Sequence, residues 1–128
     1  MGFFQGNASG SVNEQVIVAT CDLTQSQAFG GQITNYGQVN DLVISLPAAA
    51  KGMNFSVILG TTVAKYFRLD PVAGDSIYLD GVTTGDGKYV GVASATISNA
   101  IQFVAVKTGI ATYDWVAYSI SGAWTAEA

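Results

Sequence analysis

The sequence predicts an all-β protein: an antiparallel β-sandwich or jelly-roll-like domain with a short N-terminal arm. Charged residues make up only 11% of the chain, against about 25% in a typical soluble domain. Residues that favour strands, such as Val, Ile, Thr, Tyr and Phe, are plentiful. Several short runs alternate apolar and polar residues with the period of a strand. Turn residues separate these runs at intervals of about 8 to 12 residues, which is typical of sandwiches and barrels.

The length indicates a single domain, because 128 residues can enclose one hydrophobic core but are few for two. We expect residues 12–128 to form this domain. Residues 1–11 are rich in Gly, Asn and Ser and predict a flexible N-terminal arm. Phe3 and Phe4 are too apolar for a free tail. They either pack on the domain itself or anchor the chain to a neighbouring subunit.

The first part of the domain predicts two short strands with a loop between them. Residues 12–20 alternate and are polar enough for a strand at a sheet edge. Residues 22–31 end in a Gly pair, so they predict a loop with at most one helical turn. Residues 32–36 predict a short strand that ends at Tyr36 and Gly37.

A corner between two strands is the centre of the predicted fold. Residues 42–46 alternate and predict a strand with one face on the core. Pro47 ends this strand because proline has no N–H for the ladder. Gly52 supplies a position that tolerates positive φ in the turn. A second alternating run, residues 55–59, follows directly.

The rest of the chain predicts five more strands, with a hairpin turn at Asp80 and Gly81. These strands cover residues 66–70, 76–80, 88–94, 100–107 and 113–120. Several are apolar on both faces, so another sheet, the arm or another subunit should cover the second face. The residues expected in the core are Leu42, Ile44, Leu46, Phe55, Val57, Leu59, Leu69, Ile77, Leu79, Phe103 and Trp115.

The charge pattern argues against nucleic-acid and membrane partners. The net charge is −4 and the five basic residues are scattered along the chain, so the sequence predicts no basic patch that could bind the phosphates of a nucleic acid. No apolar run approaches the ~20 residues of a membrane span. The N-terminus lacks the pattern of a signal peptide. Cys21 is the only cysteine, which excludes an intrachain disulfide and fits assembly in a reducing cytoplasm.

The residue types also argue against catalysis. The chain has no histidine, which is the commonest general base and zinc ligand. Asp22 would raise the pKa of the neighbouring Cys21 thiol, so this thiol is not an obvious nucleophile. Asp75, Asp80 and Asp86 lie in predicted turns and could bind Ca²⁺, but their spacing matches no calcium loop and Asp is a common turn residue. We expect no enzyme activity, no cofactor and no metal.

Aromatic side chains near the ends of the predicted strands leave two roles open. They could stack on sugar rings, although such residues more often lie in a core or a subunit interface. They are Tyr66, Tyr78, Tyr89, Tyr113, Trp115, Tyr118 and Trp124.

Four segments resemble a pattern in small bacteriophage virion proteins, a group that includes head-decoration proteins, head fibres and the distal domains of tail fibres. The resemblance covers about residues 33–125, which is most of the domain. The segments are LPAAAKGMNF at 46–55, PVAGDSIYLDG at 71–81, FVAV at 103–106 and GAWT at 122–125.

The resemblance implies a structural protein of a phage virion, assembled in the host cytoplasm. The preferred form is a capsid decoration protein that forms a homotrimer and binds the major capsid protein. A head location is preferred because only a short arm precedes the domain. The alternative is a tail-fibre or head-fibre receptor-binding tip that adheres to a host surface glycan or protein. We expect the interface residues to be Phe3, Phe4, Tyr118 and Trp124.

Overall fold

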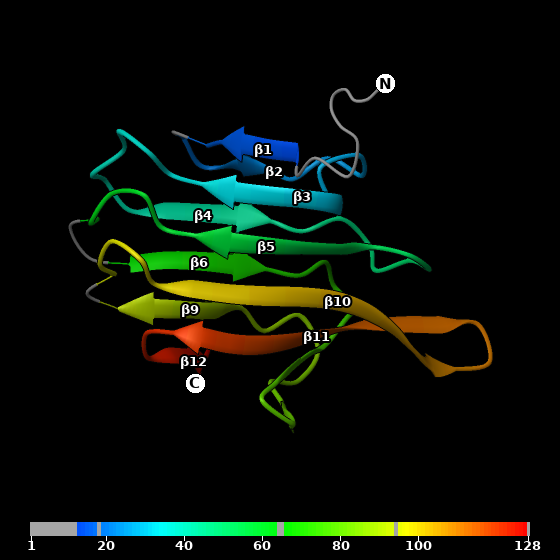
Figure 1. The fold of residues 1–128 in the computed structure, drawn as a ribbon. Coiled ribbons are helices and arrows are strands. Elements are labelled where there is room, and N and C mark those ends of the chain that lie inside the picture. Colours follow the sequence, from blue (N-terminus) through cyan, green and yellow to red (C-terminus); the bar gives the residue numbers. More distant parts are fainter. Residues whose placement is uncertain (1–12, 18, 64–65, 94, 128) are drawn as a thin grey trace, which may run out of the picture.

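The computed structural model describes residues 13–17, 19–63, 66–93 and 95–127, which form two stacked β-sheets (Figure 1). Strands make up 52% of the described residues and none of these residues is helical. The described part of the chain accordingly contains no helix that could cross a membrane. The all-β sandwich prediction is confirmed.

Seven strands form the larger sheet, sheet A, in the order β1-β3-β5-β10-β11-β7-β8. Their bounds are β1 Asn13–Val16, β3 Phe29–Thr34, β5 Asn54–Ile58, β10 Ala100–Gly109, β11 Thr112–Ser121, β7 Ile77–Leu79 and β8 Val82–Thr83. Sheet B has five strands in the order β12-β9-β6-β4-β2. Their bounds are β12 Trp124–Ala126, β9 Val90–Ala93, β6 Tyr66–Asp70, β4 Leu42–Ser45 and β2 Cys21–Asp22.

The strand pairing is mixed, so the antiparallel part of the fold prediction is wrong. β1, β3 and β5 pair in parallel in sheet A, and β2, β4 and β6 pair in parallel in sheet B. The chain changes sheet after each of its first six strands, so successive strands of one sheet run in the same direction. Alternation of inward and outward side chains is the same in both kinds of pairing. A jelly roll consists of antiparallel strands, so the jelly-roll alternative of the fold prediction is not confirmed.

Two antiparallel seams join this parallel half to the C-terminal half. β5 pairs with β10 in sheet A, and β6 pairs with β9 in sheet B. Beyond the seams, β10 pairs with β11, β9 with β12 and β7 with β8 in antiparallel ladders, while β7 joins β11 in parallel. The two halves therefore share both sheets and one core.

The proline-stopped corner is confirmed, and it is one of the crossings between the sheets. β4 ends at Ser45 in sheet B, and β5 begins at Asn54 in sheet A. Gly52 has a φ of 88°, the left-handed region that favours glycine. The Met53 N–H donates to the carbonyl of Ala50 at 3.1 Å and closes the turn.

The secondary structure differs from the sequence prediction at several places. The predicted strand 12–20 is represented by the shorter β1, and β3 begins inside the predicted loop at Phe29. The short strands β2, β8 and β12 were not predicted. The predicted Asp80–Gly81 hairpin is confirmed, since Leu79 pairs with Val82 and both turn residues have positive φ.

The core matches the predicted set closely. Ten of the eleven expected residues are buried, and Leu79 is partly buried against the same cluster. An aromatic group lies at its centre. The rings of Phe55 and Phe103 stack with centroids 5.0 Å apart, and Trp115 meets them edge-on at 5.5 Å and 6.1 Å.

Asn35 is a fully buried polar side chain that ties the end of β3 to the end of β5. Its Oδ1 accepts hydrogen bonds from the N–H groups of Gly60 at 2.9 Å and Thr61 at 3.2 Å. Its Nδ2 donates to the carbonyls of Thr61 at 2.9 Å and Gln38 at 3.3 Å. Every hydrogen-bonding atom of this amide therefore has a partner.

We predict that Asn35→Ala lowers the free energy of unfolding by about 2–4 kcal/mol, because two partly buried N–H groups lose their acceptor and two carbonyls lose their donor. The matched control is Asn40→Ala, at an exposed asparagine of the same segment, which should change stability by less than about 0.5 kcal/mol. Urea denaturation followed by tryptophan fluorescence measures both. Equal effects of the two substitutions would contradict the proposed role of Asn35.

Candidate functional site

The carboxylates that we considered as calcium ligands serve as acceptors in turns. Each accepts a hydrogen bond from a backbone N–H: Asp75 from Ala49 at 2.8 Å, Asp86 from Gly74 at 2.6 Å and Asp80 from Ser119 at 2.9 Å. Within the described ranges, no group of three or more His, Cys, Asp or Glu side chains is placed to hold a metal ion. These contacts support the interpretation of Asp75, Asp80 and Asp86 as turn residues.

Cys21 also lacks the environment of a nucleophile. It lies in β2 and packs against the core cluster. Burial raises the pKa of its thiol, and the charge of Asp22 raises it further. A thiol with a raised pKa has less of the reactive thiolate at neutral pH.

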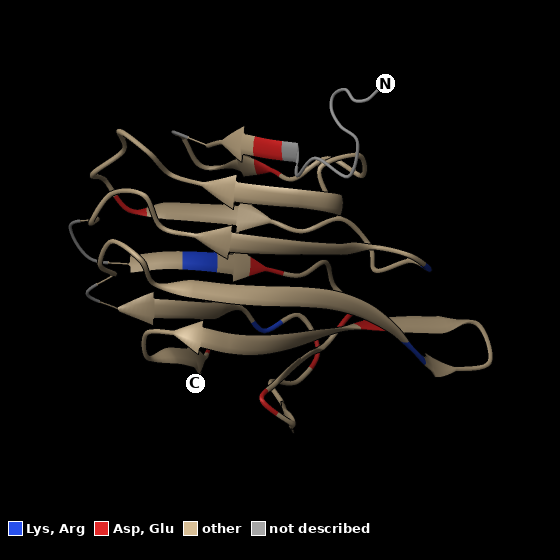
Figure 2. Cartoon of the chain, in the orientation of Figure 1, with Lys and Arg blue, Asp and Glu red and all other residues tan. Residues whose placement is uncertain are grey.

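The outer face of sheet A carries little charge across its three central strands, which are tan along most of their length in Figure 2. Phe55, Phe103 and Trp115 point into the core, so the alternate positions on these strands point outward. We call these outward residues the A face. They are Asn54, Ser56, Ile58, Gln102, Val104, Val106, Asp114, Val116, Tyr118 and Ile120. Asp114 is the one charged residue of this set, and it is buried, accepting hydrogen bonds from the Ser76 N–H and the Thr108 hydroxyl.

The hairpin formed by β10 and β11 extends beyond the rest of sheet A (Figure 1). β5 pairs with β10 only as far as Val104, and β7 pairs with β11 only from Trp115 onward. Beyond these points each strand has only the other as a ladder partner. Ile110 at the tip is 97% exposed. The hairpin thus carries an apolar side chain away from the body of the domain.

The structure separates the four expected interface residues. Tyr118 is 53% exposed on the A face, as an interface residue should be. Trp124 is buried instead: its ring meets Phe67 edge-on at 6.4 Å, and its Nε1 donates to the Ser121 carbonyl at 2.9 Å. It is a core residue because β12 turns it into the sandwich, so the interface prediction for Trp124 is corrected. Phe3 and Phe4 lie outside the described residues.

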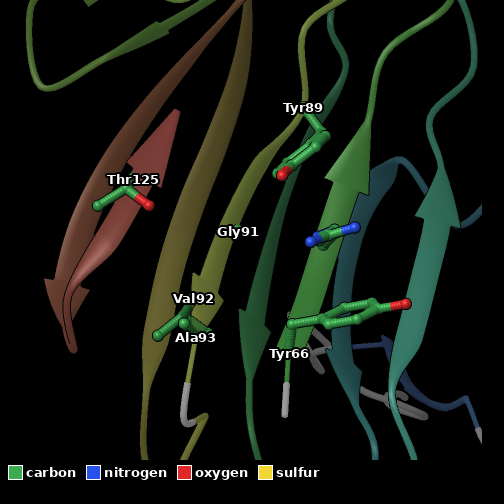
Figure 3. A pocket seen from close by; sticks show the side chains of 7 residues that line it. Tyr66, Tyr89, Gly91, Val92, Ala93 and Thr125 are labelled. Carbon is green, nitrogen blue, oxygen red and sulfur yellow. The ribbon is translucent and has the colours of Figure 1, made fainter. Parts of the chain in front are cut away.

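The outer face of sheet B carries a polar hollow at the seam between β6 and β9. Tyr66 and Arg68 point outward from β6, and Arg68 lies opposite Gly91 of β9. The Arg68 guanidinium carbon is 3.8 Å from the Tyr66 ring centroid and 4.5 Å from that of Tyr89 (Figure 3). Cation–π contacts on both sides hold the guanidinium in place.

Gly91 creates the room for this arrangement. A Cβ atom at Gly91 would lie 2.9 Å from Arg68 Cγ and 3.0 Å from the Phe67 carbonyl oxygen. The resulting hollow has a volume of about 70 Å³. It is lined by Tyr66, Arg68, Tyr89, Gly91, Val92, Ala93 and Thr125.

Two carboxyl groups lie near the hollow. Burial raises the pKa of Asp70, and the charge of Glu127 raises it further. Glu127 is tied to the wall of the hollow, since its Oε1 accepts a hydrogen bond from the Tyr89 N–H at 3.1 Å. No described carboxylate forms an ion pair with Arg68.

Sequence reasoning found part of this hollow. Tyr66 and Tyr89 were named as possible sugar-stacking residues, but Arg68 and Gly91 were not singled out. The spacing of Tyr66 and Arg68 was an available signal, because residues two apart on a strand share a face. The pairing of β6 with β9, which brings Tyr89 and Gly91 alongside, had no signal in the sequence.

Comparison with known proteins assigns no family, since no family model, curated protein or solved structure matches this chain significantly. The functional argument therefore depends on the two outer faces and on the resemblance of the four segments.

We predict that Asp70→Asn stabilises the protein at pH 7. The pKa of Asp70 is raised in the folded state, so ionisation of this carboxyl reduces stability as the pH rises through that pKa. The gain should be about 0.5 kcal/mol, because solvent screens a partly exposed group. It should vanish near pH 3, where the carboxyl is protonated in both states.

Urea denaturation at several pH values measures this difference. Asp22→Asn is the matched control, since Asp22 is an exposed carboxylate on the edge strand β2. The stability of Asp70→Asn relative to that of the control should increase as the pH rises from 3 to 7. The prediction would be contradicted if the stability of Asp70→Asn, measured relative to wild type, were lower at pH 7 than at pH 3.

Proposed function

We propose that this chain is a structural protein of a bacteriophage particle, a capsid decoration protein that acts by adhesion and has no catalytic role. The A face is the observation that carries the proposal. Its outward side chains include Ile58, Val104, Val106, Tyr118 and Ile120, and its one charged residue, Asp114, is buried within the subunit. The resemblance of the four segments to small virion proteins supplies the biological setting.

A second copy of this chain is the partner that suits the A face best. The A face exposes no charged side chain to solvent. Association through this face therefore carries no cost for desolvating a charge. Each Å² of buried apolar surface contributes about 25 cal/mol before the cost of association is subtracted. A charged partner surface would find no opposite charge there. In self-association, both surfaces of the interface are apolar, so both gain from being buried.

The projecting hairpin supplies the second patch that a trimer requires. A three-fold ring needs a heterologous contact, in which two different patches of one chain meet on its neighbours. The A face and the hairpin tip at Ile110 are two such apolar patches on different parts of sheet A. In the proposed trimer, the hairpin of each subunit packs on the A face of the next. The N-terminal arm then binds the major capsid protein of the virion.

The oligomeric state tests the proposal through one substitution on the A face. Wild-type protein should contain three chains by size-exclusion chromatography with light scattering. Ile120→Lys should weaken association by at least about 100-fold, because it would bury an unpaired charge. Ile120 is 65% exposed, so the folded subunit tolerates the lysine.

Ile97→Lys is the matched control, because Ile97 is 60% exposed in a loop outside the A face. This variant should remain trimeric. Circular dichroism should show the same strand spectrum for both variants. A monomeric wild type, or equal behaviour of the two lysine variants, would overturn the proposed use of the A face.

Attachment to the capsid is tested through the arm. Deleting residues 1–11 should change the melting temperature by only a few degrees, while co-sedimentation with undecorated particles is lost. A full-length chain with Phe3→Ser and Phe4→Ser should show the same loss, because aromatic burial would repay the entropy of ordering the arm. Both variants should stay trimeric. Normal co-sedimentation of both would place the anchor on the β-domain.

A further inference from the structure

The hollow on sheet B holds a charged group whose hydrogen-bonding capacity is unused. A guanidinium carries five N–H donors, yet Arg68 makes no hydrogen bond or ion pair with any described residue. Tyr66 and Tyr89 contact the flat faces of the group, which leaves its N–H edges for another acceptor. Arg68 is also the only arginine of the chain.

The charge of the site selects a monoanion. A carboxylate accepts two parallel hydrogen bonds from one guanidinium, so a single arginine satisfies it. A phosphate dianion would need further donors, and Lys or His side chains do not line the hollow. Asp70 and Glu127 nearby, with the net charge of −4, also oppose a highly charged ligand.

The remaining walls suit a sugar ring beside the carboxylate. Ala93 presents an exposed methyl group beside Gly91, on which the C–H face of a ring can rest. Thr125 adds a hydroxyl that can donate to or accept from a sugar hydroxyl. Figure 3 shows Thr125 across the hollow from Tyr66 and Tyr89.

We propose that this hollow is a binding site for a carboxylated sugar, such as a hexuronic acid, with Arg68 holding the carboxylate and Thr125 a ring hydroxyl. The site lies on sheet B, whereas the proposed subunit contact uses sheet A. Sugar binding is therefore independent of the proposed assembly, and a trimer would present three sites outward.

The test is a nuclear magnetic resonance titration of the full-length, ¹⁵N-labelled protein with methyl β-D-glucuronide. The amide signals of Gly91 and Thr125 should shift. Methyl β-D-glucoside, which has the same ring without the carboxylate, and sodium acetate, which has the carboxylate without the ring, should each bind at least tenfold more weakly. Equal binding of the glucoside would overturn the role of the carboxylate. Equal binding of acetate would overturn the role of the sugar.

Variants locate the ligand within the hollow. Arg68→Lys keeps the charge but loses the planar fork, so the glucuronide should bind at least tenfold more weakly. Thr125→Val keeps the shape at an exposed position and should weaken glucuronide binding severalfold without changing acetate binding. Lys51→Arg is the matched control, a charge-conserving exchange at an exposed position outside the hollow, and should bind like wild type. Unchanged glucuronide binding in both site variants, or no shift at Gly91 in wild type, would overturn the proposal.

Discussion

The stack of Phe55 on Phe103 is the contact on which the two halves of this fold depend. Phe55 belongs to β5, the last parallel strand of sheet A, and Phe103 belongs to β10, the first strand of the C-terminal half. The two residues are register partners across the seam, with ring planes 5° from parallel. Trp115 of β11 closes the group edge-on. Among the described strands of sheet A, β5 and β10 form the only pairing between the halves, so the aromatic group stabilises the register at this seam.

The crossing pattern of the first six strands explains why the chain offers two unlike outer faces. Each crossing turns the inward side chains of both sheets toward one core, so the outward positions of the two sheets face away from each other. Sheet A leaves Val, Ile and Tyr at many of these positions, whereas sheet B leaves Arg68, Asp70 and Asp22. The charged residues of the sheet A strands, Glu14, Lys107 and Asp114, lie in its edge strand and in the projecting hairpin, so the centre of this face carries no charge. The apolar side is then the one with most to gain from a partner.

Alternation in the sequence predicted which side chains point inward, because burial enforces a period of two on every strand. It could not predict strand direction, since parallel and antiparallel ladders show the same alternation. The short β12 was missed because three residues are too few to display a period, and Trp124 was consequently placed at an interface. The hollow on sheet B could not be predicted for a different reason. Arg68 and Gly91 are 23 positions apart, and only the seam between β6 and β9 makes them neighbours.

Both proposed sites draw on the seams that join the halves. In sheet A, the outward positions of β5, β10 and β11 become one continuous face only after β5 pairs with β10. In sheet B, the Arg68 side chain lies over Gly91 only after β6 pairs with β9. A larger residue at Gly91 would disturb the sheet backbone and the Arg68 stem together, because the nearest atoms belong to both. Gly91 is therefore needed both for the pairing of β6 with β9 and for the position of Arg68 in the hollow. Both proposed sites lie where the two halves of the fold pair.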